Sequence, residues 1–180
     1  MNTPTQTKSP PASILLVCDC LDTLNLVLGR CAAGLLVLMV AIQSAIIVFR
    51  AAFGLGSLAT QDAVLYMHAA LIMLCLAYTW KEDGHVRVDV FYHRFSPLTQ
   101  TWINTVGNIL FLLPFAAFIF ASSWDYALES WRNQEGSGDA GGLDKVYWLK
   151  ALLPLAGGLL CIQGISDTLR KLITLTYREH

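Results

Sequence analysis

The sequence has few charged residues and no strong excess of either sign. Only 14% of its 180 residues are charged, whereas 55% are hydrophobic and the mean hydropathy is +0.53. Ordinary soluble domains carry about a quarter charged residues. The net charge of −1 also lacks the basic excess that binding to nucleic acid requires. The composition therefore indicates an integral membrane protein, with no nucleic acid among its partners.

Catalytic signatures are missing as well. The chain contains no GxSxG, HExxH or Walker sequence, which are the usual signs of nucleophilic and phosphoryl chemistry. Its acidic residues lie at the ends of the apolar runs, so no membrane-embedded carboxylate is available to bind a coupling ion. The two halves also lack the repeated motif that autonomous secondary transporters usually show. We predict that the protein is not an enzyme and does not transport a solute alone.

Histidine and cysteine are too scattered to indicate a cofactor. His68 is the only histidine within an apolar run, so a haem held by two histidines would have no second ligand there. We expect His68 to be buried and hydrogen-bonded across helices. A four-helix redox anchor that binds haem or quinone is the alternative function. The five cysteines include no CxxC pair, so we expect neither a disulfide framework nor a cofactor.

What the sequence has in abundance is long apolar runs. They cover approximately residues 31–49, 63–80, 101–123 and 146–166. The first contains no charge over 19 residues and as a helix would be about 28 Å long, close to the hydrocarbon thickness of a bilayer. We therefore predict an all-α fold of four transmembrane helices with short amphipathic segments at the interface. A disordered tail at 1–12 precedes a single membrane domain at 13–180, whose first part, 13–28, has helical periodicity of its own.

Local signals predict where several helices begin, bend or extend. Ser96 and Pro97 form a typical helix start, and Asp62 is placed as the cap of the second span. Pro114 predicts a kink in the third span. The charged sequence after Ser123 keeps helical propensity, so the third helix should continue for two or three turns beyond the bilayer.

Two rows of side chains are spaced so that each lies on one helical face. Polar residues recur at i, i+3, i+4 and i+7 in the third run, and small residues recur at i, i+4 and i+7 in the fourth. Inside a membrane, small and polar faces pack against protein rather than lipid. These helix-packing or partner-facing residues are Thr101, Asn104, Thr105 and Asn108, followed by Gly157, Cys161 and Gly164.

The stretch 81–97 concentrates the charge and turn chemistry in the middle of the chain. His85, Asp89 and His93 could share a helical face and ligate a metal. Neighbouring basic residues and an alternation of valines favour an interfacial loop in contact with lipid phosphates instead. We therefore expect no metal site.

Basic residues predict the orientation. With both termini and the 81–97 loop inside, the count is seven inside against three outside, and the positive-inside bias then places both termini in the cytoplasm. The inside set is Lys8, Lys81, Arg87, Arg94, Arg170, Lys171 and Arg178, and the outside set is Arg50, Arg132 and Lys145.

The predicted outer loop before the fourth run is acidic. It carries Asp125, Glu129, Glu135, Asp139 and Asp144. Lys150, near the outer end of the fourth run, is expected to extend to the surface or to pair with Glu129, Asp139 or Asp144.

Two motifs resemble a known family. The sequences GHVRVDVFYHRFSP and GGLDKVYWLKALLPLAGGLL are similar to the small membrane subunit of TRAP (tripartite ATP-independent periplasmic) transporters, the DctQ-like proteins, over roughly residues 21–171. The first motif is carried by Gly84, His85, Val86, Arg87, Asp89, Ser96 and Pro97, with Arg94 in the same loop. The second is carried by Gly141, Gly142, Leu143, Lys150 and Pro154.

The resemblance implies a division of labour in the bacterial inner membrane. A periplasmic substrate-binding protein would deliver an organic acid, a large multi-span permease subunit would carry it with sodium, and the small multi-pass subunit would brace the large one. The 81–97 loop would lie among the inner membrane lipids. The outer segment 125–145, which includes Glu129, would lie near the docked binding protein.

Overall fold

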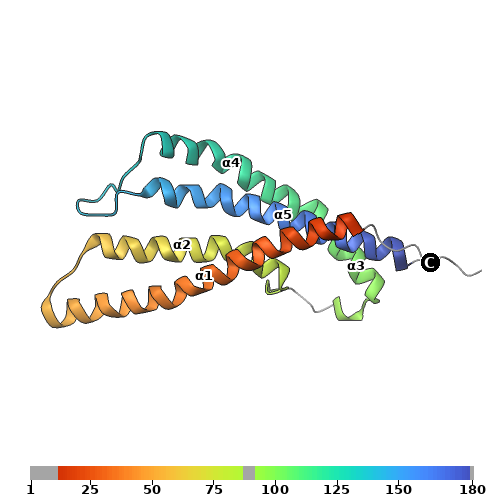
Figure 1. The fold of residues 1–180 in the computed structure, drawn as a ribbon, viewed down its shortest axis with the longest axis horizontal. Helices are drawn as coiled ribbons and strands as arrows, with labels where there is room; N and C mark the ends of the chain where they lie inside the picture. The colour runs from red at the N-terminus through yellow and green to blue at the C-terminus, as the bar shows by residue number, and fades with distance from the viewer. Residues whose placement is uncertain (1–11, 87–91, 179–180) are drawn as a thin grey trace, which may run out of the picture.

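The computed structural model describes residues 12–86 and 92–178, and within these ranges every regular element is helical. In chain order the elements are α1 (Ala12–Phe53), α2 (Leu58–Lys81), the short 3₁₀ turn η1 (Tyr92–Arg94), α3 (Pro97–Gly107), the π-helical turn η2 (Asn108–Leu112), α4 (Leu113–Arg132) and α5 (Val146–Arg178) (Figure 1). In the described part of the chain, four helical stretches are long and apolar enough to cross a membrane. The predicted all-α class and its four membrane helices are confirmed.

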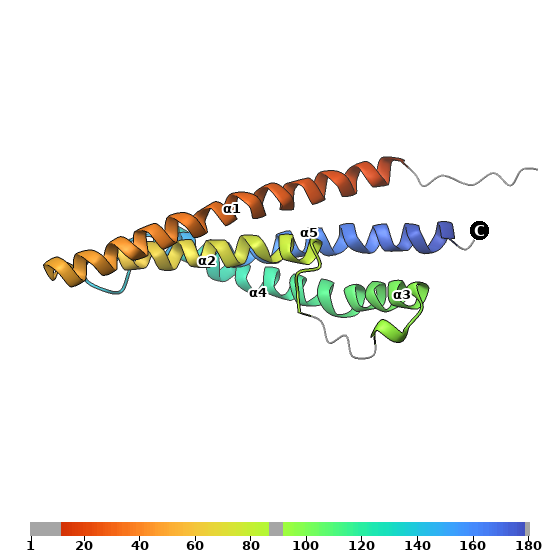
Figure 2. The same ribbon diagram turned by 90° about the horizontal axis from the view of Figure 1, so that it is seen from below.

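The helices form an elongated bundle with two different ends (Figures 1 and 2). The α1–α2 and α4–α5 connections lie together at one end, which we call the loop end. The beginning of α1, all of α3 and the last turns of α5 lie at the other, which we call the terminal end. The predicted cytoplasmic orientation concerns this terminal end and stays a prediction. The predicted tail, 1–12, lies almost wholly outside the described residues.

Helix α1 is longer than the sequence indicated. The separate segment at 13–28 and the span at 31–49 form one helix of 42 residues, which is about 63 Å long. Arg30, expected to close the first span, lies in the middle of this helix on an exposed face. The helix therefore extends well beyond the thickness of a hydrocarbon layer.

The first half of α1 buries small and polar side chains. Val17 and Leu24, two apolar residues of the segment 13–28, are 55% and 45% exposed. Cys18, Asn25 and Gly29 are buried instead. Small and polar side chains fit this face because a neighbouring helix approaches closely and hydrogen-bonds to it.

Helix α2 begins before the residue predicted to cap it. Its N-cap is Ser57, which has an extended backbone, with φ −123° and ψ 127°. Asp62 lies inside the helix and accepts a hydrogen bond from the α4–α5 connection instead. The cap prediction for Asp62 is wrong because a tertiary partner, invisible in the local sequence, uses that carboxylate.

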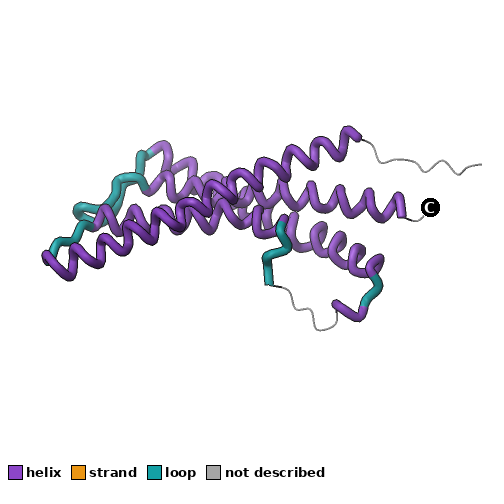
Figure 3. The backbone as a smooth tube through the Cα atoms, turned by 60° about the horizontal axis from the view of Figure 1, so that its bottom comes forward, coloured by secondary structure: helices purple, strands orange, loops and turns teal. Residues whose placement is uncertain are grey.

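The third membrane helix runs from α3 through η2 into α4 without leaving a helical path (Figure 3). Ser96 caps α3 by accepting from the Thr99 amide at 3.2 Å, and Pro97 follows in the first turn. Pro114 lacks an amide hydrogen and crowds the preceding turn. The irregularity that results is the π-helical turn just before it, in which the Leu113 amide donates to the Asn108 carbonyl.

Helices α4 and α5 pack closely at glycine. A Cβ added to Gly157 of α5 would lie 2.8 Å from the backbone nitrogen of Phe120 and 3.2 Å from the carbonyl oxygen of Ala116. No real Cβ tolerates the shorter distance, so the two backbones would have to separate. Gly34 of α1, in contrast, has no neighbour within 4 Å of the same position.

These two glycines give a matched test of the packing. Gly157→Ala should lower the free energy of unfolding by about 1–3 kcal/mol because it overpacks the α4–α5 contact. Gly34→Ala should leave stability unchanged or raise it by up to about 1 kcal/mol, since alanine is the better helix former. Unfolding of the detergent-purified variants in a denaturing detergent measures both. Equal stability of the two variants would contradict the close contact.

Candidate functional site

The terminal end of the bundle contains a network of polar side chains that joins helices far apart in the sequence. Its members come from α1, α2, η2 and α5, and we call them the terminal network. They are Asp19, Asp22 and Asn25 of α1, Trp80 of α2, Asn108 of η2, and Gln163, Ser166, Asp167, Arg170 and Lys171 of α5.

Asp22 is the centre of the network. Its Oδ1 accepts from Ser166 Oγ at 2.8 Å and from Gln163 Nε2 at 3.0 Å. Its Oδ2 lies 2.9 Å from Nη2 of Arg170, whose same nitrogen also reaches Asp19 at 2.6 Å. The Asp22 side chain is only 14% exposed. A carboxylate removed this far from water requires such partners, because unpaired burial of a charge is costly.

A buried amide pair extends the network toward the middle of the bundle. Asn25 Nδ2 donates to Gln163 Oε1 at 2.8 Å, and both residues are about 2% exposed or less. Gln163 therefore bridges Asn25 and Asp22 through the two ends of one amide. The Cys18 thiol donates across the same contact to the Ser166 carbonyl, and the Ser166 hydroxyl, which donates to Asp22, lies 3.4 Å from the Cys18 carbonyl.

A second carboxylate, Asp167, fastens the other two helices to α5. Its Oδ2 accepts from Asn108 Nδ2 at 2.7 Å and from Trp80 Nε1 of α2 at 3.4 Å. Lys171, one turn further along α5, pairs with the same oxygen at 2.5 Å. The terminal network thus connects all four membrane helices.

The four polar residues predicted to share one face of the third helix make different hydrogen bonds. Asn108 is buried and reaches Asp167, while Thr105 is buried and bonds its own helix at the Thr101 carbonyl. Asn104 donates to the Tyr92 hydroxyl at 2.7 Å and so contacts η1. Thr101 donates to Pro97 and stays within the first turns of α3. One member of the row, Asn108, therefore hydrogen-bonds to a neighbouring membrane helix.

The small residues of α5 lie against the third helix and its π-helical turn. A Cβ at Gly164 would meet Leu113 and Leu112 side-chain carbons at 2.9 and 3.0 Å, and Gly157 faces α4 one and a half to two turns earlier. Cys161, between them, is partly buried. This face of α5 is therefore occupied within the bundle.

The structure describes the two ends of the 81–97 loop. His85 lies against the end of α2, with Nε2 3.3 Å from the Leu76 carbonyl and its ring 5.6 Å from that of Trp80. Gly84 closes α2 through its amide, which donates to the Thr79 carbonyl. Arg94 is exposed at the end of η1. Arg87 and Asp89 lie outside the described residues, as does the alternation of valines after Val86. Among the residues that the structure describes, no group of three metal-binding side chains comes together.

The loop end is held by a contact between the two helical hairpins. Asp62 Oδ2 accepts from the Leu143 amide at 2.8 Å, and Tyr66 donates to the Leu143 carbonyl at 3.3 Å. A Cβ at Gly142 would come within 2.8 Å of the Asp62 carboxylate, so the close approach needs glycine. Gly141 has a φ of +84°, which favours glycine for a different reason. Both glycines therefore shape the connection that reaches α2.

Lys150 pairs with an acidic residue that was not among its expected partners. Its Nζ lies 2.5 Å from Glu135 Oε2 and 4.2 Å from the centroid of the Tyr126 ring. The predicted pairing with Glu129, Asp139 or Asp144 is wrong, because the chain reverses after α4 and brings Glu135 back over α5. Glu129 is exposed. The hydrogen bond from Lys150 lowers the pKa of the Glu135 carboxyl below its ordinary value of 4.5.

His68 is exposed, so the expected burial is wrong. It lies on the open side of the α1–α2 hairpin beside Gln43 and Gln61. Among the described residues, no other helix supplies a hydrogen bond to its side chain.

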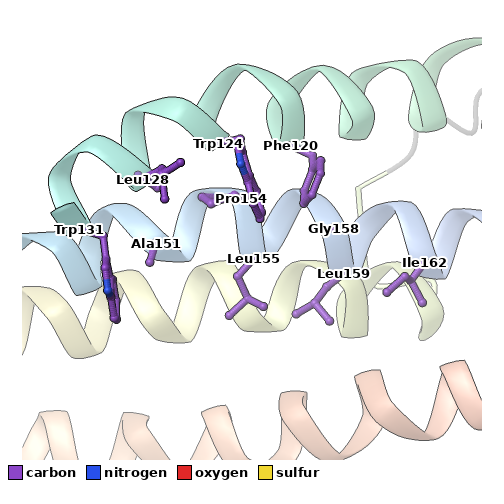
Figure 4. A pocket seen from close by; sticks show the side chains of 11 residues that line it. Phe120, Trp124, Leu128, Trp131, Ala151, Pro154, Leu155, Gly158, Leu159 and Ile162 are labelled. Carbon is purple, nitrogen blue, oxygen red and sulfur yellow. The ribbon is translucent and has the colours of Figure 1, made fainter.

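A hollow of about 410 Å³ lies between α4 and α5 on the outside of the bundle (Figure 4). Phe120, Trp124 and Leu128 of α4 and Pro154 and Leu155 of α5 are among its lining residues. Aromatic and aliphatic side chains without a charged group suit hydrocarbon. This surface therefore matches an acyl chain better than a polar substrate.

Most of the chain matches a known protein family. A family model described as the DctQ component of tripartite ATP-independent periplasmic transporters matches residues 36–174. The chain belongs to the DctQ family. It is thus a small membrane subunit of a TRAP transporter. Searches among curated proteins and solved structures gave no significant match for this DctQ chain.

The most highly connected residues of this DctQ chain were not among the predicted sites. Asp22 and Asn25 lie in the segment 13–28, for which the sequence predicts only helical periodicity, and Arg170 enters only the count of basic residues. A signal was nevertheless present: Cys18, Asp22 and Asn25 recur at i, i+4 and i+7, and Gln163, Ser166 and Arg170 recur at i, i+3 and i+7. Each set lies on one helical face. The pairing of one set with the other required the fold.

The two acidic residues that share Arg170 give the first test for this DctQ subunit. Asp22→Ala should reduce the free energy of unfolding by about 2–5 kcal/mol, because three donors on α5 lose their acceptor in a largely buried position. Asp19→Ala should cost less than about 1 kcal/mol, since Asp19 is 64% exposed. Denaturing-detergent titrations of both variants measure the difference. Equal losses of stability in the two variants would show that Asp22 is not the centre of the terminal network.

The Glu135–Lys150 pair predicts a pH dependence. A carboxyl whose pKa is lowered on folding contributes stability that is complete above its unfolded pKa and is lost as the pH falls through the folded pKa. The advantage of the wild type over Glu135→Gln should therefore be constant above about pH 5 and shrink below the ordinary value of 4.5. Thermal unfolding of both proteins between pH 3 and 7 measures this. An advantage that persists at the acid end would argue against the ion pair.

Proposed function

We propose that this DctQ subunit is a non-catalytic brace for the large permease subunit of its transporter, in the inner membrane of a bacterium. The large subunit would move an organic acid with sodium, and a periplasmic substrate-binding protein would deliver the acid. The small subunit would contribute a fixed framework of four helices. Membership of the DctQ family supports the tripartite setting, and the structure of the chain supports the role within it.

This proposal rests on the hydrogen bonds that the interior polar groups form with one another. Gln163 and Ser166 each donate to Asp22, and Asn108 donates to Asp167. A translocation site needs polar groups that can exchange water or a solute for the protein. In the terminal network these groups instead cross-link helices, which favours rigidity over transport.

The surface of the bundle supports the same role. Large apolar side chains project outward along the membrane helices, including Val37, Phe111 and Phe118, which are 74%, 75% and 67% exposed. Such a surface is stable only against lipid or another membrane protein. A brace needs an apolar surface on the side that contacts its partner and on the side that contacts lipid.

The two ends would then face different surroundings. In this proposal the terminal end lies in the cytoplasm, where the exposed Arg94 is suited to anionic lipid headgroups. The loop end lies in the periplasm, where the segment 125–145 would approach the binding protein. Glu135 and Lys150 pair there, so the segment is held to α5 at a defined position.

Reconstitution tests the division of labour. Proteoliposomes are prepared with the permease subunit alone, with the DctQ subunit alone and with both, each with the loaded binding protein and an inward sodium gradient. We expect uptake of the radiolabelled organic acid only with both subunits, and a stable complex on size exclusion.

Uptake by the DctQ subunit alone would overturn the proposal, since a brace has no path of its own. Full uptake by the permease alone would also count against it. The Asp22→Ala variant adds a link to the structure: it should reduce assembly of the complex while binding of the acid by the isolated periplasmic protein stays unchanged.

A further inference from the structure

The open side of the α1–α2 hairpin forms a second groove, of about 460 Å³, near the loop end. Its walls include Met39 and Gln43 of α1 and Gln61, Leu65 and His68 of α2. Both Gln43 and His68 are exposed. The groove differs from the hollow between α4 and α5 in carrying hydrogen-bonding side chains.

These side chains are without partners inside the chain. Across residues 12–86 and 92–178, no hydrogen bond is formed by the side chain of Gln43, Gln61 or His68. Ser44, beside them, bonds back to the Val40 carbonyl of its own helix at 2.8 Å and needs nothing further. Two amides and an imidazole are therefore available to an external group.

Their depth makes the lack of partners significant. Gln43 lies ten residues before the end of α1 and His68 ten residues after the start of α2, about 15 Å along each helix. Both belong to the runs predicted to cross the bilayer. Hydrocarbon offers no hydrogen bonds, so polar side chains at this depth face protein.

The register of α1 shows what kind of element fits. Gln43 follows Asn25 by eighteen residues, which is five whole turns, so both side chains lie on one face of the helix. At the terminal end that face is covered by α5, and Asn25 bonds to Gln163 there. Toward the loop end α1 diverges from α5 (Figure 1). At the terminal end α5 occupies the position beside this face. Toward the loop end, no helix of the described residues occupies it.

We propose that a transmembrane helix of the large permease subunit lies in this groove. That helix would present small side chains to Met39 and Leu65 and hydrogen-bonding side chains, such as amides or hydroxyls, to Gln43 and His68. The inference rests on the proposed function and adds to it the face through which the brace holds its partner. A lipid chain fits poorly because it leaves Gln43 and His68 unsatisfied at a depth without water, whereas the apolar hollow between α4 and α5 suits it.

A double variant tests the hydrogen bonds. Gln43→Leu with His68→Leu removes no bond within the chain, so the unfolding transition of the isolated subunit should not move to lower denaturant. The amount of permease that co-purifies at limiting concentration should fall about five- to tenfold, the effect expected for two interhelical bonds in a membrane. The matched control is Phe118→Leu, an exposed residue of α4, which should leave co-purification unchanged.

Photo-crosslinking tests the location directly. A benzoylphenylalanine at Met39, in the groove, should form an adduct with the permease in the assembled transporter, and the same group at Leu155, in the α4–α5 hollow, should not. An adduct of position 39 with a second DctQ chain or with lipid alone would overturn the inference. Normal co-purification of the double variant would also overturn it while leaving the proposed function intact. Failure of the wild-type pair to assemble would instead reject both.

Discussion

The carboxylate of Asp22 is the constraint on which the bundle depends. It lies among helices where water has little access, so its charge is tolerable only with donors arranged around it. Ser166, Gln163 and Arg170 supply those donors, and all three stand on the last helix of the chain. The first and last membrane helices are thereby fixed in one register, because a shift of a single residue would turn the donors away.

The rest of the architecture follows from where this constraint acts. Asp167 adds α2 and the π-helical turn to the same cross-linked end. At the opposite end the hairpins meet through the Leu143 backbone on Asp62 and Tyr66. The bundle is therefore tied at both extremities, while between them α1 diverges from α5 and leaves a polar face uncovered.

The sequence was most informative where a property depends on neighbouring residues. The four membrane helices, the start of α3 at Ser96 and the continuation of α4 to Arg132 could all be predicted from apolar length, capping chemistry and propensity. Pro114 predicts a kink, and what the structure shows there is a change in hydrogen bonding in the turn before it.

What the sequence could not supply was the identity of partners across long separations. Asp62 has the features of a helix cap, and only the folded chain shows that it serves Leu143. Lys150 had several acids within reach, and the path of the α4–α5 connection selected Glu135. For α1, apolar periodicity predicted a helix, but the contact with α5 is made by polar and small residues that this periodicity does not identify. The family match begins at residue 36 and so does not include the α1 half of the terminal network.

The separation of its members along the chain gives the terminal network a consequence for biogenesis. Asp22 and Ser166 are 144 positions apart, so their bond can form only after the final helix has been synthesised and inserted. Until then the α1–α2 hairpin lacks the donors that Ser166, Gln163 and Arg170 supply to its buried carboxylate. Insertion of α5 is thus the step that fixes the first membrane helix to the last.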